Sequence, residues 1–137
     1  MLKPAAHHSS PRPARDRWLL LVALLAFALW LAALGPIRSW ASGAGLRDHW
    51  LIGVAPSFFA GATMALWQAF AVRSTPLAAA AGAVAIVALA EAAQFALPRY
   101  TPDIRDVLAG IAGVALVVPL LVWRARRAAK LTGPSAD

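Results

Sequence analysis

Residues 91–106 read EAAQFALPRYTPDIRD and place five charged side chains between two long apolar runs. The run before them, residues 77–90, carries no charge, and neither does the run after them, residues 107–123. Two such runs joined by a polar connection predict two membrane-spanning helices with a polar hairpin at the bilayer edge. Because an ionisable residue at membrane depth is costly, this hairpin is also the first candidate for a functional site.

The composition of the chain is that of a membrane protein. Of its 137 residues, 61% are hydrophobic and 14% are charged, against roughly 45–50% and about 25% in soluble domains. With about 20 residues for each span, this length accommodates four helices and short connections, without a separate soluble domain. We therefore predict an all-α, polytopic integral membrane protein with four transmembrane helices in an antiparallel bundle.

The apolar runs and the turn residues between them set the expected boundaries of the helices. Residues 35–49 contain a Gly-Pro pair and two further glycines and are expected to form a loop. Residues 73–76 are too few to separate two helices, so the second and third spans should be neighbours. The third span is dominated by alanine, which predicts a thin helix packed inside the bundle. The expected spans are residues 18–34, 50–72, 77–97 and 102–123.

The two ends of the chain flank this membrane domain of residues 18–123. Residues 1–17 hold three prolines and four basic residues, which predicts a disordered, basic cytoplasmic arm. Its adjacent histidines, His7 and His8, lack a third ligand and are interpreted as solvated rather than metal-binding. Residues 124–137 are expected to form a basic cytoplasmic tail. A cleaved signal peptide ending near Gly43 is the alternative for the first span, but its apolar run is long for one.

The distribution of basic residues predicts the orientation. In a four-span arrangement nine lysines and arginines fall on one side of the membrane and four on the other. The positive-inside rule then places both termini on the cytoplasmic side of the membrane. We expect that membrane to be the plasma membrane of a bacterium. The net charge of +7 arises beside apolar runs, so we expect contacts with anionic lipid headgroups rather than nucleic acid. The absence of cysteine excludes thiol chemistry.

Small residues recur on one face of two of the expected helices. In the second span they are spaced by four, at Ser57, Gly61 and Ala65. In the fourth span a carboxylate precedes them, with Asp106, Gly110, Gly113 and Val117 on one face. Both stripes predict close contact with another helix. At the start of the fourth span, Thr101 is the expected N-cap, with Pro102 at the first helical position and Asp103 in the first turn.

The polar hairpin supplies the main candidate site. Glu91 and Gln94 share a helix face, and the following residues reach the same level, so that Glu91 is expected to pair with Arg99 or Arg105. Three interpretations remain open: a clasp between two helices, a ligand site, or an exposed loop. A weaker candidate is Asp48 with His49, where Asp48 would cap the second span and His49 would lie at the interface. The candidate site residues are Glu91, Gln94, Arg99, Asp103, Arg105 and Asp106.

The same hairpin resembles the second half of the VanZ-like membrane protein family. The resemblance rests on Glu91-x-x-Gln94, on Pro98-Arg99 and on the segment DIRDVLAGIAG at residues 103–113, and covers roughly residues 85–116. Gly110 stands where that family usually has asparagine, and the family's Asp-Lys-x-x-His segment is reduced here to RDHW at residues 47–50. Membership implies a cell-envelope protein linked to the response to glycopeptide antibiotics.

Three functions follow as hypotheses. The first is a non-enzymatic VanZ-like protein whose outward-facing cluster binds or shields a lipid-linked envelope precursor or a lipid headgroup. In it, Arg99 and Arg105 contact the anion while Glu91 and Asp106 hold them, and no metal or other cofactor is expected. The second is a small proton-coupled transporter of cationic compounds that uses Glu91. The third, an intramembrane enzyme, lacks a Ser/His pair at membrane depth. The oligomeric state is left open.

Overall fold

The computed structural model describes residues 17–46, 49–97 and 102–131. All regular elements in these ranges are helices, and four segments are long and apolar enough to cross a membrane, namely Arg17–Gly43, Trp50–Val72, Pro76–Gln94 and Ile104–Lys130. The prediction of an all-α chain with four apolar helices is therefore confirmed. The elements are α1 (Arg17–Leu34), α2 (Pro36–Gly43), α3 (Trp50–Trp67), η1 (Gln68–Val72), α4 (Pro76–Gln94) and α5 (Ile104–Leu131).

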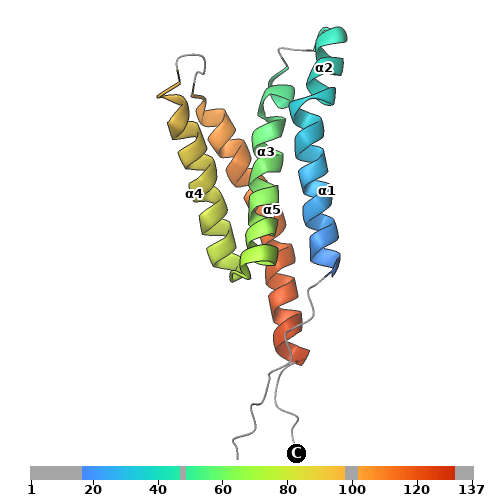
Figure 1. Ribbon diagram of the computed structural model, residues 1–137, viewed down its shortest axis with the longest axis vertical. Helices are drawn as coiled ribbons and strands as arrows, with labels where there is room; N and C mark the ends of the chain where they lie inside the picture. The colour runs from blue at the N-terminus through green and yellow to red at the C-terminus, as the bar shows by residue number, and fades with distance from the viewer. Residues whose placement is uncertain (1–16, 47–48, 98–101, 132–137) are drawn as a thin grey trace, which may run out of the picture.

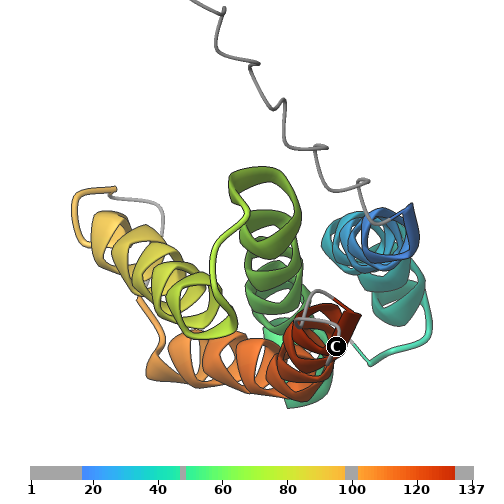
Figure 2. The same ribbon diagram turned by 90° about the horizontal axis from the view of Figure 1, so that it is seen from below.

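Helix α3 lies at the centre of the molecule and contacts α1, α4 and α5. Seen along the helices, α1 and α4 flank α3 on opposite sides, and α5 crosses a third side (Figure 2). Figure 1 shows the end of α4 and the starts of α3 and α5 at the same end of the molecule as α2. The turn between η1 and α4 lies toward the other end, beyond which α5 projects.

The prediction of a loop over residues 35–49 is wrong for its first half, which forms α2. The helical hydrogen bonding continues across the Gly-Pro step, because the Gly35 N–H donates to Leu31 at 3.2 Å and the Ser39 N–H donates to Gly35 at 2.9 Å. Pro36 is tolerated because the first residue of a helix has no intrahelical acceptor for its N–H. Gly45, with φ at +74°, lies just beyond the end of α2.

Helices α3 and α5 approach each other at their backbones. A Cβ atom added at Gly61 would collide with the carbonyl oxygen of Gly110, and one added at Gly113 would collide with that of Phe58. Each stripe was expected to permit close contact with another helix, and the structure shows that the two stripes face each other. Such close packing lets dispersion contacts replace the missing hydrophobic driving force between helices in lipid.

The alanine-rich helix α4 is peripheral, which contradicts the prediction that it packs inside the bundle. In the most apolar 18-residue stretch of α4, 11% of the residues are buried, compared with 33% in the corresponding stretches of Trp50–Val72 and Ile104–Lys130. Its Ala79 and Ala83 join the core, while Leu77 and Leu89 are 80% and 69% exposed. Short alanine side chains allow α4 to approach one neighbour closely. A helix is buried inside a bundle only when other helices surround it on several sides, as they do α3.

The turn between the second and third spans is tight. The last turn of the second span is the π-helical η1, and Arg73 follows it in the left-handed region with φ at 59°. The Thr75 hydroxyl then accepts a hydrogen bond of 3.3 Å from the Ala78 N–H and caps α4. The second span thus ends at Val72 as predicted, whereas the third runs from Pro76 to Gln94, three residues short of Leu97.

Helix α5 continues well past the apolar run, to Leu131. The basic residues predicted as a tail are therefore helical as far as the structure describes them. Trp123 makes an edge contact with Trp18 at 6.3 Å between ring centroids, and the Arg127 guanidinium lies 5.4 Å from the Trp123 ring. The contact between Trp18 and Trp123 joins α5 to the start of α1, and Arg127 packs on the same Trp123 ring from within α5. The expected arm, apart from Arg17, and residues 132–137 lie outside the described residues.

Candidate functional site

Glu91 closes the hairpin between α4 and α5. It lies in the last turn of α4, and only 9% of its surface is exposed. One carboxylate oxygen accepts a hydrogen bond of 2.6 Å from the Gln94 side-chain amide, and the other accepts one of 2.6 Å from the backbone N–H of Asp103. Two bonds to an ionised acceptor offset the desolvation of a largely buried carboxylate. Glu91 therefore acts as a clasp between the end of α4 and the residue that precedes α5.

Asp103 caps α5. Its side-chain oxygen accepts a hydrogen bond of 2.9 Å from the backbone N–H of Arg105, and its carbonyl oxygen accepts one of 3.0 Å from Asp106. This is the geometry of an N-cap, in which a carboxylate satisfies a free N–H of the first turn. The helix begins at Ile104, so the prediction of Pro102 at its first position is wrong. Thr101, the expected cap, lies outside the described residues.

Asp106 lies where α3, α4 and α5 meet. It is half-buried in the first turn of α5, and the Ser57 side chain of α3 hydrogen-bonds to it. The charges of Glu91 and Asp103 act on it from the hairpin, and the charge of Arg38 acts on it from α2. A carboxyl group with a hydroxyl partner and two carboxyl neighbours concentrates negative potential at this end of the bundle.

Arg105 borders a depression between α3 and α5. The depression has a volume of about 520 Å³ and is lined by Trp50, Val54, Arg105 and Leu108. Within the described ranges, Arg105 forms no ion pair, so the predicted pairing of Glu91 with Arg105 is not what the structure shows. The alternative partner, Arg99, lies outside the described residues. A guanidinium beside an apolar surface suits a ligand that is anionic at one end and apolar at the other.

The hairpin residues in the described part of the chain fall into two groups. The structure brings together Glu91, Gln94, Asp103 and Asp106, whereas Arg105 lines the depression beside them. The sequence indicated that Glu91 and Gln94 share a helix face, but it gave no indication that a backbone N–H is the second partner of Glu91. A clasp was one of the three interpretations, and its partner is a neutral group rather than an arginine.

Of the second candidate pair, Asp48 and His49, the structure describes only His49. Asp48 lies outside the described residues, while His49 occupies the N-cap position of α3 and makes no side-chain capping bond. Its ring stacks on Trp50 at 6.5 Å with an interplanar angle of 17°. Because Trp50 lines the depression, His49 lies beside one wall of it.

Two residues near Asp106 were missed by reasoning from the sequence. Ser57 was recognised only as a small residue, and Arg38 was counted only as a basic residue of the first connection. The signal for Ser57 was its place four residues before Gly61, on the face of α3 that meets α5. No comparable signal existed for Arg38, because the sequence did not indicate that α2 is helical.

The described residues offer no group of three or more His, Asp or Glu side chains that could hold a metal ion. The fold and the site together define an all-helical protein with four helices capable of crossing a membrane and a polar cluster at one end. Searches for relatives find no matching protein family, no similar curated protein and no similar solved structure.

Proposed function

We propose that this chain is a non-enzymatic, VanZ-like protein of the bacterial plasma membrane that binds a phosphate-bearing lipid headgroup at its outer end. Its four apolar helices would cross the membrane in an antiparallel bundle, with both termini in the cytoplasm. The candidate ligands are an ordinary anionic phospholipid and a lipid-linked cell-envelope precursor, which share a phosphate group attached to a long apolar chain.

The depression beside Arg105 is the observation that carries this proposal. It combines a guanidinium without an ion pair in the described ranges with the apolar surfaces of Trp50, Val54 and Leu108. Arginine binds phosphate oxygens through two parallel hydrogen bonds, and the apolar surface fits the first methylenes of a lipid chain. The polar and apolar parts of the depression therefore match the two parts of a lipid.

The Glu91 clasp holds Arg105 in place. Glu91 fixes the backbone of Asp103, and Asp103 in turn accepts a hydrogen bond from the Arg105 N–H. Two consecutive bonds thus run from the end of α4 to the residue that would contact the phosphate. This arrangement gives the carboxylates of the hairpin a positioning role. The VanZ-like part of the proposal rests on the resemblance of the hairpin sequence, and it would place the function in the cell envelope and the glycopeptide response.

A small proton-coupled transporter of cationic compounds is the second candidate. It is favoured by the three carboxyl groups at one end of the bundle, with Asp106 beside Ser57. Glu91 itself suits this role poorly, because both of its oxygens already accept hydrogen bonds. Asp106 would then be the group that exchanges protons for a cation.

Binding of purified full-length protein to lipids tests the proposal. The panel consists of an anionic phospholipid, a zwitterionic phospholipid and a lipid-linked wall precursor, measured on wild type, Arg105→Gln and Glu91→Ala. Arg126→Gln, at the opposite end of α5, is the matched control. Losing a charged hydrogen-bond partner should weaken binding of the anionic ligands about tenfold or more in Arg105→Gln, and less in Glu91→Ala.

The outcomes separate the two candidates. Saturable binding that is lost in Arg105→Gln and kept in Arg126→Gln supports the proposed site. A preference for the anionic phospholipid or for the lipid-linked wall precursor then shows which of the two is the ligand. Equal binding by both arginine variants rejects the site. Cation binding coupled to proton release, abolished by Asp106→Asn, would support the transporter instead.

A further inference from the structure

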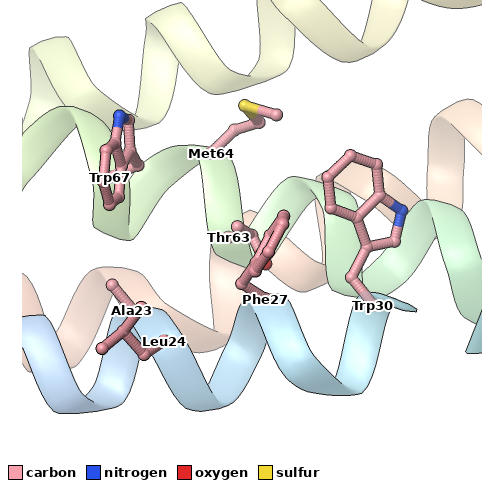
Figure 3. A pocket seen from close by; sticks show the side chains of 7 residues that line it. All are labelled: Ala23, Leu24, Phe27, Trp30, Thr63, Met64 and Trp67. Carbon is pink, nitrogen blue, oxygen red and sulfur yellow. The ribbon is translucent and has the colours of Figure 1, made fainter. Parts of the chain in front are cut away.

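A second pocket lies between α1 and α3, away from the polar hairpin. It has a volume of about 300 Å³, at the lower end of the range for ligand sites. Figure 3 shows the rings of Phe27 and Trp30 directed from α1 toward α3, and three residues of α3 complete the lining. Aromatic and aliphatic side chains make up almost all of the lining, which consists of Ala23, Leu24, Phe27, Trp30, Thr63, Met64 and Trp67.

Thr63 is the exception in this lining. It is 5% exposed, and its hydroxyl has no hydrogen-bond partner within the described part of the chain. A buried hydroxyl without a partner costs free energy, and a helical threonine usually avoids that cost by bonding to the carbonyl oxygen four residues earlier. Here that bond is absent. The hydroxyl is therefore a polar group in an apolar pocket without a partner among the described residues.

The depth of Thr63 restricts what could become its partner. Thr63 lies thirteen residues after Trp50 and nine before Val72, which corresponds to about 20 Å and about 14 Å along the helix axis. In a bilayer this position is within the hydrocarbon core, which holds little water and no headgroups. A partner for the hydroxyl must therefore be a molecule that dissolves in hydrocarbon.

We infer that this pocket binds a compact, lipid-soluble molecule that carries a carbonyl or hydroxyl oxygen. Its flat apolar part contacts Phe27 and Trp67, and its oxygen pairs with the Thr63 hydroxyl. The acyl chain of a bulk lipid has no such oxygen in this region and would leave the hydroxyl unpaired. The hydroxyl is buried, so a ligand reaches it only when a lining side chain moves. Phe27 can make this movement because it is 41% exposed and its contact with the Trp30 ring is edge-on, at 5.7 Å between ring centroids.

Two probes of nearly the same shape test the inference. 9-Fluorenone carries one carbonyl oxygen, and fluorene lacks it. Equilibrium binding of both is measured on the full-length protein in lipid nanodiscs, with empty nanodiscs as the background. A hydrogen bond inside a membrane protein contributes a factor of about 3 to 15 in affinity. Wild type should therefore bind 9-fluorenone more tightly than fluorene by about this factor.

The variants identify the pocket and its hydroxyl. Thr63→Val keeps the shape of the side chain, so it should remove the preference for 9-fluorenone and leave fluorene binding unchanged. Leu24→Trp should block both probes by filling the pocket, whereas Leu25→Trp, on a residue that is 60% exposed and outside the lining, should block neither. Arg105→Gln should also leave both affinities unchanged, which separates this site from the lipid site proposed above.

Three results would overturn the inference. They are a lack of saturable binding, equal affinities of wild type for the two probes, and a preference for 9-fluorenone that persists in Thr63→Val. Thermal melting of each variant accompanies the titrations. If Thr63→Val melts below wild type, the pair Leu24→Trp and Leu25→Trp decides whether the pocket is the site, and the ratio of the two affinities in wild type decides the role of the oxygen.

Discussion

The carboxylate of Glu91 accepts a hydrogen bond of 2.6 Å from the backbone N–H of Asp103, twelve residues later in the chain. This bond joins the end of α4 to the start of α5 without an ion pair between Glu91 and Arg105. The hydrogen bond therefore fixes the end of α4 to the residue that caps α5.

Replacing Glu91 by alanine removes both hydrogen bonds at once. Hydrogen bonds to charged groups contribute about 1.5–3 kcal/mol each, so Glu91→Ala should lower the free energy of unfolding by at least this amount. Thermal melting in detergent measures the loss. Because the partners are an amide and a backbone N–H, neutralising Arg105 in the same chain should not restore stability; recovery in the double variant would show that an arginine is the true partner.

Replacing Asp103 tests the cap of α5. Asp103→Ala should destabilise the protein by about 0.5–2 kcal/mol, because the Arg105 N–H loses its acceptor. Asp103→Asn retains an acceptor and should remain close to wild type. Hydrogen exchange of the first turn of α5 localises the effect, and identical exchange in the two variants would contradict the capping role.

Gly113→Ala tests the contact between α3 and α5. The added Cβ would collide with the Phe58 carbonyl oxygen, so the helices must separate, and overpacking of this kind typically costs about 1–3 kcal/mol. Gly53→Ala on α3 is the control, since nothing lies within 4 Å of its Cβ position, and its melting temperature should match or exceed wild type. A Gly113→Ala protein as stable as the Gly53→Ala protein would show that the two backbones do not meet there.

Reporter fusions test the proposed orientation. Alkaline phosphatase is active only outside the cytoplasm, so a fusion after Gly43, at the end of α2, should be active. A fusion at the C-terminus should be silent. The reverse pattern would place the polar hairpin and the Arg105 depression on the cytoplasmic side and would exclude an outward-facing lipid site.

Local patterns made much of the fold predictable. The spacing of small residues indicated that α3 and α5 each have a face suited to close helix contact, but it did not indicate that these two faces meet each other. The prediction of a loop over residues 35–49 was wrong in its first half. A Gly-Pro pair interrupts a helix only when the backbone hydrogen bonds around it are lost, and here the bonds from Gly35 to Leu31 and from Ser39 to Gly35 persist. The central place of α3 could not be predicted, since alanine content does not reveal how many neighbours a helix has.

The sequence predicted the hairpin members of the candidate site, but it missed Ser57 and Arg38 and most of the hydrogen bonds. Helix periodicity placed Gln94 beside Glu91 correctly. The bond from Asp103 depends on how the hairpin turns, which no local pattern encodes, and charge complementarity favoured an arginine in its place. The sequence also could not predict that the Thr63 hydroxyl lacks a partner, because the hydroxyl of a threonine in an apolar helix usually bonds to a backbone carbonyl of the same helix.

The central position of α3 has a consequence for biogenesis. During synthesis the ribosome releases α1 first, and its principal partner among the spans is α3, which follows next. A nascent chain that has reached Val72 can therefore already assemble the α1–α3 pair, including the pocket around Thr63. The remaining spans, α4 and α5, contact each other as well as α3 and can join as a preformed hairpin. The α1–α3 pair thus forms between helices that follow each other in the chain, whereas the most extensive contact of α3, that with α5, forms only after α4 has been made.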